Sequence, residues 1–418
     1  MSLSLAATAA RAEPEERVSV ACPNCAAVGL TIFYEARNVP VHNSLIQSTR
    51  QEALDFPRGD VVLGFCGQCG FIGNAAFDPR CLGYSRAYED QQSFSPTFNA
   101  FARELAAHLI DKYGLRDKTI VEIGCGKGDF LALLCELGHN RGVGIDPAAI
   151  PERLQSDAAQ RITFVQDYYS PKYAHYRGDL VCCRHTLEHI APTAEFLTTV
   201  RRSIGDRLDT AVFFEVPDVL RVLREQAYWD IYYEHCSYFG PGSLARLFRR
   251  SGFDVTSVSL GFDDQYVLLE ARPVALDSDG GGEPRGAGTQ ALPPEESVEQ
   301  MRCEVEAFAR RVKQKLDYWK THLVAMKQQN KRAVVWGSGS KCVSFLSTVG
   351  AGACVDYVVD INPHRHGKFI PGVGKEIMPP EFLRAYAPDE VIVMNAIYLG
   401  EIRRALAQMQ ITCAVVAV

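Results

Sequence analysis

The feature that most limits the fold of this chain is an alternation of short apolar runs and helical stretches between residues 101 and 273. Short apolar runs separated by helices predict a parallel, doubly wound sheet. The last two runs, 254–260 and 265–273, are separated only by GFDD, which predicts a hairpin and an antiparallel final strand. The parallel strands are expected at 119–124, 141–146, 162–167, 179–184 and 210–217.

A glycine-rich segment, EIGCGKGDF, places Gly124, Gly126 and Gly128 between the first expected strand and the following helix. Glycines let a ligand approach the backbone closely, and an acid at the end of the second strand, Asp146, can accept hydrogen bonds from ribose hydroxyls. The glycine spacing is not that of the dinucleotide motif G-x-G-x-x-G. The competing interpretations are therefore a structural turn, an NAD site and a site for S-adenosylmethionine (SAM).

Two further acids favour SAM. Glu122 stands two residues before the first glycine and completes the methyltransferase pattern E-x-G-x-G-x-G. Asp167 ends the third strand, where an acid suits the adenine amino group of SAM. A parallel sheet closed by a hairpin is also the layout of class I methyltransferases. We therefore expect an α/β chain with a SAM-binding class I methyltransferase domain over residues 101–273.

Two C-x2-C pairs occur in the first hundred residues, and they comprise Cys22, Cys25, Cys66 and Cys69. Each pair can offer two sulfurs to one ion, so the four thiolates predict a closed, tetrahedral, structural Zn2+ site. A redox C-x-x-C motif is the alternative, but such a motif normally occurs singly on a βαβ pattern. Cys81 is a spare cysteine that could replace one ligand. Residues 1–100 are expected to form a zinc-binding domain.

Histidines follow the fourth expected strand in the segment RHTLEHI, residues 184–190. His185, Glu188 and His189 match the H-x-x-E-H signature of zinc proteases, but that signature needs a helix and this segment stands at a strand end. Ligands of open α/β sheets bind beyond the carboxyl ends of the strands. We expect His185 and His189 to face SAM or its acceptor, and helix capping or packing is the alternative.

A denser cluster follows the fifth strand, where Tyr232, Glu234 and His235 stand close together before an amphipathic helix. A carboxylate, an imidazole and a phenol at one strand end suit proton transfer near neutral pH. The alternative is a patch of aromatic packing.

The rest of the chain divides in two. Residues 274–296 are rich in Gly, Pro and charge, which predicts a linker. Residues 297–418 begin with a long helix of about nine turns. A strand, a glycine-rich turn and a helix follow in RAVVWGSGSKCVSFL, and further strands follow those. This pattern predicts a second, smaller Rossmann-like domain.

At these residues the chain resembles the sugar C-methyltransferases, a family of SAM-dependent enzymes that act on nucleotide-linked deoxy-keto-sugars. The resemblance extends over nearly the whole chain, including the E-H-x-x-Y-F segment that begins at Glu234. It implies that His235 is the base that removes a proton beside the ketone. It also implies that Tyr232, Glu234, His189 and Tyr88 line the sugar pocket. Because an adjacent carboxylate can orient an imidazole, we expect Glu234 to orient His235.

The resemblance further implies that the C-terminal domain holds the nucleotide through Gly337, Gly339, Lys341, Asp360 and Asn362. The segment VVDINPHRHGKFIPG matches the family pattern well. Two segments depart from it. The C-terminal turn reads GSGSKCVSFLS instead of Gly-Ala-x-x-Lys-Gly, and YEDQQSFSPTF, which begins at Tyr88, lacks a second tyrosine.

Composition excludes several classes. The 418 residues are 47% hydrophobic and 22% charged, and no stretch of 18 apolar residues occurs, so a soluble globular protein without a membrane span is expected. The net charge of −6 argues against a nucleic-acid partner. Residues 1–18 lack the basic region of a signal peptide, and the cysteines suit a reduced state, so a cytoplasmic location is expected.

The activity expected is C-methylation of a small molecule by a monomer or homodimer. Three alternatives stay open. They are O- or N-methylation of another small metabolite on the same scaffold, methylation of a nucleic acid, and SAM binding without catalysis.

Overall fold

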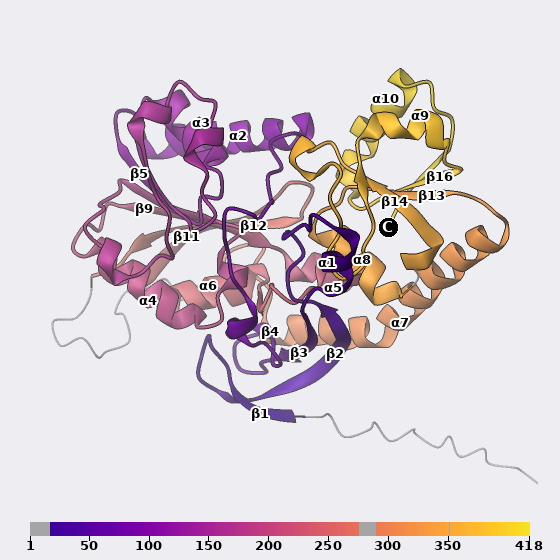
Figure 1. Cartoon of the computed structure of the whole chain (residues 1–418). Coiled ribbons are helices and arrows are strands. Elements are labelled where there is room, and N and C mark those ends of the chain that lie inside the picture. The colour runs from indigo at the N-terminus through magenta and orange to yellow at the C-terminus, as the bar shows by residue number, and fades with distance from the viewer. Residues whose placement is uncertain (1–16, 276–289, 351) are drawn as a thin grey trace, which may run out of the picture.

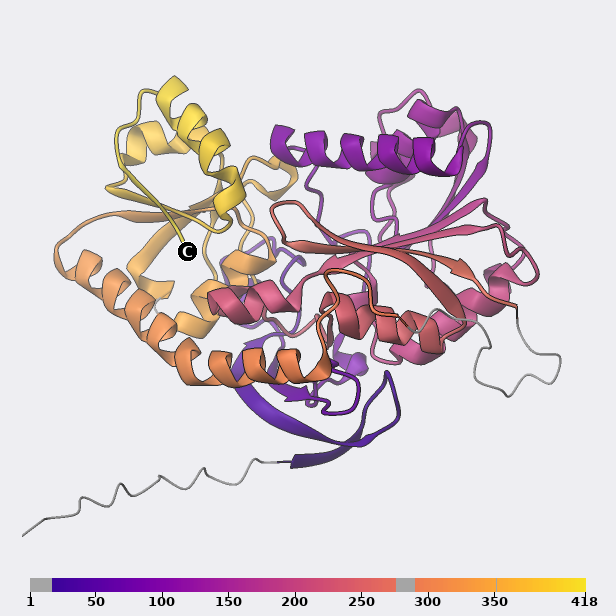
Figure 2. The same cartoon turned by 180° about the vertical axis from the view of Figure 1, so that it is seen from behind.

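The computed structural model describes residues 17–275, 290–350 and 352–418, and its strands form three sheets (Figure 1). The expected linker, 274–296, lies largely outside these described residues. The largest sheet and its helices form one half of the molecule, the C-terminal domain forms the other half, and the N-terminal sheet lies below both. The view from behind shows the same arrangement (Figure 2).

The largest sheet has the strand order β11-β12-β9-β8-β5-β6-β7. Strands β5 to β9 pair in parallel. Strand β12 pairs antiparallel with β9 and forms an antiparallel hairpin with β11, as the spacing of the apolar runs predicts. The bounds are β5 Thr119–Ile123, β6 Arg141–Ile145, β7 Ile162–Val165, β8 Leu180–Arg184, β9 Ala211–Pro217, β11 Phe253–Gly261 and β12 Tyr266–Pro273. The class I methyltransferase fold is thus confirmed.

Helices cover both faces of this sheet. On one face pack α2 (Pro96–Tyr113) and α3 (Asp129–Gly138), and on the other pack α4 (Thr193–Ile204) and α6 (Pro241–Arg250). Successive side chains of a strand point to opposite faces of its sheet. Ile120 of β5 therefore packs in the cluster that contains α2 and α3, and its neighbour Val121 packs in the cluster on the other face. Both faces of a parallel sheet are buried in this way.

The N-terminal sheet is antiparallel and borrows its last strand from the middle of the chain. Strand β10 (Ser237–Tyr238) pairs with β4 (Ile72–Asn74) directly after the Tyr232–His235 cluster. The sheet therefore anchors that cluster. The other strands of this sheet are β1 Arg17–Ala21, β2 Val28–Pro40 and β3 Arg58–Phe65, and the short helix α1 Arg50–Leu54 lies between β2 and β3 in the chain.

The C-terminal domain is a parallel sheet of order β15-β14-β13-β16-β17 preceded by the long helix α7 (Val298–Gln328). A capping box between Ser297 and Gln300 starts α7. The expected Rossmann-like arrangement is present. The other bounds are β13 Ala333–Trp336, α8 Ser340–Val349, β14 Val355–Val359, β15 Ile377–Met378, α9 Leu383–Tyr386, β16 Glu390–Val393, α10 Leu399–Gln408 and β17 Ala414–Ala417.

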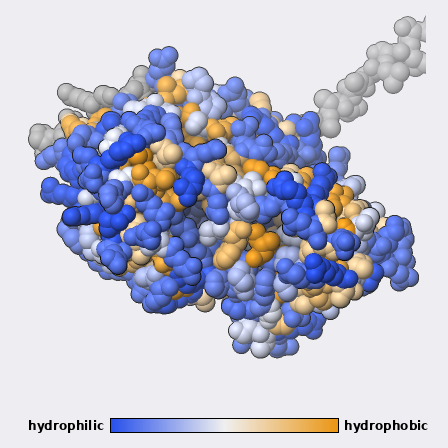
Figure 3. Space-filling view, turned by 90° about the horizontal axis from the view of Figure 1, so that it is seen from above, coloured by the Kyte–Doolittle hydropathy of each residue, from blue (hydrophilic) through white to orange (hydrophobic). Residues whose placement is uncertain are grey.

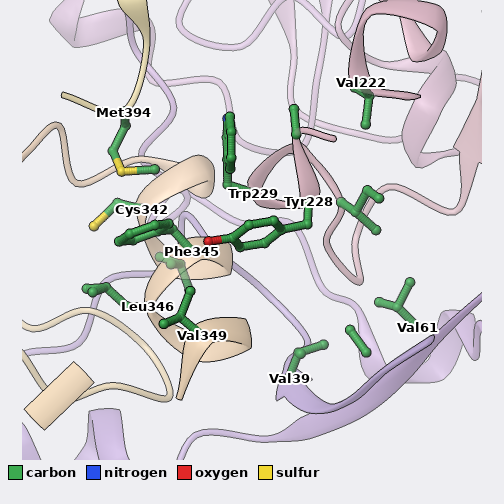
Figure 4. Packing of buried hydrophobic residues seen from close by; sticks show 14 of the residues in the cluster. Val39, Val61, Val222, Tyr228, Trp229, Cys342, Phe345, Leu346, Val349 and Met394 are labelled. Atoms are coloured by element: carbon green, nitrogen blue, oxygen red, sulfur yellow. The ribbon is translucent and has the colours of Figure 1, made fainter. Parts of the chain in front are cut away.

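One hydrophobic core joins the N-terminal sheet, α7, the C-terminal domain and α5 (Val219–Glu225) (Figure 4). At its centre the rings of Tyr228 and Phe345 stack with centroids 6.2 Å apart, and Val61 of β3 belongs to the same cluster. The regions that composition separates along the chain therefore share buried contacts, and these contacts set how the sheets face one another.

The surface is mostly polar. Seen from above, hydrophilic residues cover most of the molecule, and the hydrophobic ones form small separate groups (Figure 3). Among the described residues, no helix combines the length and the apolar character that crossing a membrane requires.

Candidate active site

A cavity of about 830 Å³ lies where the large sheet faces the C-terminal domain. Gly124, Asp146 and His185 line it from the carboxyl ends of β5, β6 and β8. Gly337 and Asp360 line it from the corresponding ends of β13 and β14. Two sheets thus direct their strand ends into one cavity, which is where open α/β sheets bind ligands.

The glycine-rich loop follows β5 and has left-handed backbone conformations. Gly124 has φ +72°, and a Cβ built there would lie 1.8 Å from Oγ1 of Thr186. The backbone N–H of Gly126 donates to Oδ2 of Asp146 at 2.8 Å, and that of Ala148 donates to Oδ1 at 2.6 Å. Asp146 therefore connects the loop to the end of β6 while it lines the cavity.

Gly128 differs from the other two glycines, because it does not line the cavity. It precedes α3 with φ +88°, and a Cβ there would lie 2.6 Å from the ring of Phe164. Close packing against β7 and the start of α3 explain this glycine. Its expected place beside the cofactor is corrected accordingly.

The remaining expected cofactor residues line the same cavity. Glu122 is buried, and one of its carboxylate oxygens has no hydrogen-bond partner among the described residues. Burial raises the pKa of Glu122 to about 8 although Arg184 opposes this. Asp167 pairs with Lys172 and Tyr173, whose hydrogen bonds lower its pKa to about 2. A loop without side chains at Gly124 and Gly126, flanked by carboxylates, fits SAM.

Replacing Gly124 with alanine should weaken SAM binding by at least about fivefold. A left-handed residue with a Cβ costs roughly 1–2 kcal/mol, and the loop must also move away from Thr186. Isothermal titration calorimetry with SAM would measure the loss, with Gly400→Ala on α10 as the matched control. Unchanged affinity in a folded Gly124→Ala protein would contradict the assignment of this loop.

His185 adopts φ +50° and lies between two carboxylates. Its Nε2 lies 2.7 Å from Glu215, which also pairs with Arg184 at 2.8 Å, and its Nδ1 lies 3.5 Å from Glu188. Burial disfavours the charged imidazole, but the two carboxylates outweigh it and raise the pKa of His185 to about 9. A cationic imidazole held in this way suits positioning more than proton removal.

The other two histidines meet at the cavity wall. The rings of His189 and His235 are perpendicular with centroids 4.7 Å apart, and Tyr232 packs on His235 at 4.1 Å. Tyr88 also lines the cavity. Burial, and then the neighbouring histidines, hold the pKa of His235 well below its usual range. His235 is therefore neutral near pH 7, the form that accepts a proton.

Glu234 does not hydrogen-bond to His235. Its fully buried carboxylate accepts from Nδ1 of His42 at 3.0 Å and from the backbone N–H of Asn43 at 3.0 Å. The backbone N–H of Gly83 donates to Nε2 of His42 at 3.1 Å, so the proton of this imidazole is on Nδ1. The expectation that Glu234 orients His235 is corrected: Glu234 holds His42, and it lies behind the cavity wall.

Sequence reasoning missed Tyr84, which His42 and Gly83 position. The Tyr84 hydroxyl lies 2.7 Å from Nδ1 of His189, and the Tyr84 ring packs on Tyr88 with centroids 5.0 Å apart. Tyr84 stands four residues before Tyr88 in GYSRAY. A second tyrosine so near Tyr88 in the sequence is the signal that could have pointed to it.

Replacing Glu234 with glutamine should lower turnover by about ten- to a hundredfold, because a misplaced catalytic group commonly costs that much. Both oxygens of Glu234 accept hydrogen bonds, so the NH2 of the new amide would face the N–H of either His42 or Asn43 and release the loop that carries Tyr84. Steady-state kinetics would show a fall in kcat, with Glu104→Gln on α2 as the control. If Glu234 acts through Tyr84, the double variant Glu234→Gln and Tyr84→Phe should lose less turnover than the product of the two single losses.

The C-terminal wall contributes all five residues expected for the nucleotide. Lys341 lies 2.8 Å from Asp230, and Asn362 donates to Glu89 at 3.0 Å. Asp360 accepts from the backbone N–H of Ser338 at 2.7 Å. Charged and polar groups of two domains thus face one another across this part of the cavity.

The four paired cysteines meet away from the cavity. Their sulfurs lie within 4.8 Å of one another, with Cys22–Cys69 and Cys25–Cys66 both at 3.6 Å. Sulfurs about 2.3 Å from a tetrahedral Zn2+ lie about 3.8 Å apart, so the cluster fits that ion. Cys81 is exposed and is not part of the cluster.

Comparison with known proteins agrees with this architecture. A methyltransferase domain matches residues 98–258, and a C-methyltransferase C-terminal domain matches residues 281–415. The C-methyltransferase NovU of Streptomyces niveus is 26% identical over 320 residues, which is 72% of each chain.

Solved methyltransferase structures match about two fifths of this chain. Magnesium protoporphyrin IX methyltransferase of Synechocystis PCC 6803, with bound SAH, is 15% identical at a TM-score of 0.33 and covers 41% of this chain and 84% of its own. The 1,6-didemethyltoxoflavin-N1-methyltransferase of Burkholderia thailandensis is 16% identical at a TM-score of 0.31. The match covers 43% of this chain and 81% of that protein. The chain thus combines a methyltransferase domain of class I fold with a region that matches the C-methyltransferase C-terminal domain, and these matches support a SAM-dependent methyltransferase.

Proposed function

We propose that the enzyme methylates the carbon beside a ketone in a nucleotide-linked deoxysugar, with His235 as the base. The observation that supports this most is the position of His235. It is 6% exposed, lines the cavity shared with the glycine loop, and has no hydrogen bond to its ring from the described residues. No side chain in that part of the chain is therefore hydrogen-bonded to the nitrogen that must accept the proton.

The reaction needs a base and a stabilised enolate, because a proton beside a ketone is only weakly acidic. His235 accepts that proton, and the electron pair of the broken C–H bond forms the enolate. Tyr232, or His189 held by Tyr84, donates a hydrogen bond to the enolate oxygen. SAM bound at the glycine loop would supply the electrophilic methyl group. The enolate carbon forms the new C–C bond as the methyl–sulfur bond breaks, the ketone is restored, and S-adenosylhomocysteine is the leaving group. The proton leaves His235 to solvent.

The nucleotide is assigned to the C-terminal wall. Lys341 stands at the N-terminal end of α8, which follows Gly339, and both line the cavity. A helix N-terminus with a lysine favours a diphosphate. Asn362 and Asp360 offer the hydrogen bonds that a base or ribose requires. Zn2+ in the cysteine cluster has a structural role, because four thiolates leave no open position for a substrate.

The test uses the full chain in D2O with a dTDP-4-keto-deoxyhexose mixture, with and without SAM, followed by mass spectrometry. Methyl transfer with SAM and deuterium uptake without it would support the proposal. Methyl transfer without deuterium uptake would favour O- or N-methylation. If protein that binds SAM shows neither methyl transfer nor deuterium uptake, the nucleotide-sugar acceptor is contradicted.

A further inference from the structure

A second cluster of metal-binding side chains lies in the cavity itself. Glu188, His189 and His235 each offer one ligand atom, and these atoms lie within 4.8 Å of one another. All three residues line the cavity. They come from two separate segments, the turn after β8 and the segment before β10. The H-x-x-E-H segment thus contributes Glu188 and His189, and His235 supplies the second imidazole.

Glu188 has an ionic neighbour in His185 but no hydrogen bond that satisfies its carboxylate. Its side chain is 2% exposed, and within the described part of the chain neither carboxylate oxygen has a hydrogen-bond partner. The nearest cationic group is Nδ1 of His185, 3.5 Å from Oε1. A buried carboxylate that lacks hydrogen bonds is costly, and an ion would satisfy it.

The histidines are arranged to complete a site. Nδ1 of His189 pairs with the hydroxyl of Tyr84 at 2.7 Å, which leaves Nε2 as its second nitrogen. A metal-bound histidine commonly has its other ring nitrogen held by such an outer partner. A set of two imidazoles and one carboxylate binds first-row transition ions in preference to Mg2+ or Ca2+.

We propose that Glu188, His189 and His235 bind a divalent transition ion such as Zn2+, and that this ion inhibits the enzyme. The inhibition rests on the proposed function, because an ion on the lone pair of His235 takes the electrons that the base needs. The positions not filled by protein face the cavity, so the ion also occupies space beside the acceptor.

The site is tested on the full chain with its cysteine-bound metal in place, by titration with Zn2+ and with Co2+. One additional ion per chain is expected. The Co2+ form should lack the thiolate-to-metal charge-transfer band that the cysteine cluster would give. Glu188→Gln should weaken binding by at least about tenfold, since even an outer-shell partner contributes that much. His189→Gln should do the same, and Glu104→Gln should not.

Inhibition is the second readout. Turnover should fall as Zn2+ fills the site, with the same midpoint as binding, and a mild chelator should restore it. Absence of an additional ion, or binding that Glu188→Gln and His189→Gln leave unchanged, would overturn the site. Binding that leaves turnover unchanged, or raises it, would overturn the inhibition. The binding measurements need no acceptor, so a failure of the metal site can be distinguished from a failure of the proposed function.

Discussion

His235→Gln should lower turnover by about 10²–10⁴-fold, the usual contribution of a general base, and leave SAM affinity unchanged. His235 faces the cavity beside Tyr232 and His189, whereas the glycine loop that fits SAM follows a different strand. Glutamine keeps much of the side-chain volume but cannot accept the proton near pH 7. Single-turnover assays would measure methyl transfer, and calorimetry would measure SAM affinity.

The matched control is His175→Gln, because His175 is exposed. Deuterium uptake into the acceptor without SAM separates a base from a positioning residue. It should disappear in His235→Gln and persist, at a lower rate, in Tyr84→Phe. Full deuterium uptake by His235→Gln would assign the base elsewhere, with His189 as the next candidate.

The double variant Cys66→Ser and Cys69→Ser should lose one zinc ion per chain and melt more than about 10 °C lower. Structural zinc contributes roughly 10–16 kcal/mol in isolated zinc-finger peptides, and about 1 kcal/mol already shifts the Tm of a domain this large by 2–4 °C. Cys66 and Cys69 are 1% and 6% exposed and connect the turn after β3 to the pair Cys22–Cys25.

Elemental analysis and calorimetry would measure the two effects, and Cys303→Ser replaces an exposed cysteine on α7 as the control. Loss of zinc with an unchanged Tm would contradict a structural role. Zinc-free native protein in which the cysteines form disulfides would support the redox alternative.

Local pattern sufficed for most of the fold. The apolar runs predicted β5 to β9, and the four-residue GFDD turn predicted the antiparallel hairpin of β11 and β12. The glycine loop and Asp146 came to one site for the same reason, since the carboxyl ends of neighbouring parallel strands meet at one edge of a sheet. Such information is contained within a few residues along the chain.

The partners of individual side chains were decided by the tertiary structure. Glu234 stands next to His235 in the sequence, yet its carboxylate binds His42, 192 residues away. Tyr84 reaches His189 because the N-terminal sheet takes β10 as its last strand and packs beside the large sheet. A buried carboxylate accepts hydrogen bonds from the donors that the packing of separate sheets brings next to it. Local sequence periodicity does not predict how those sheets pack.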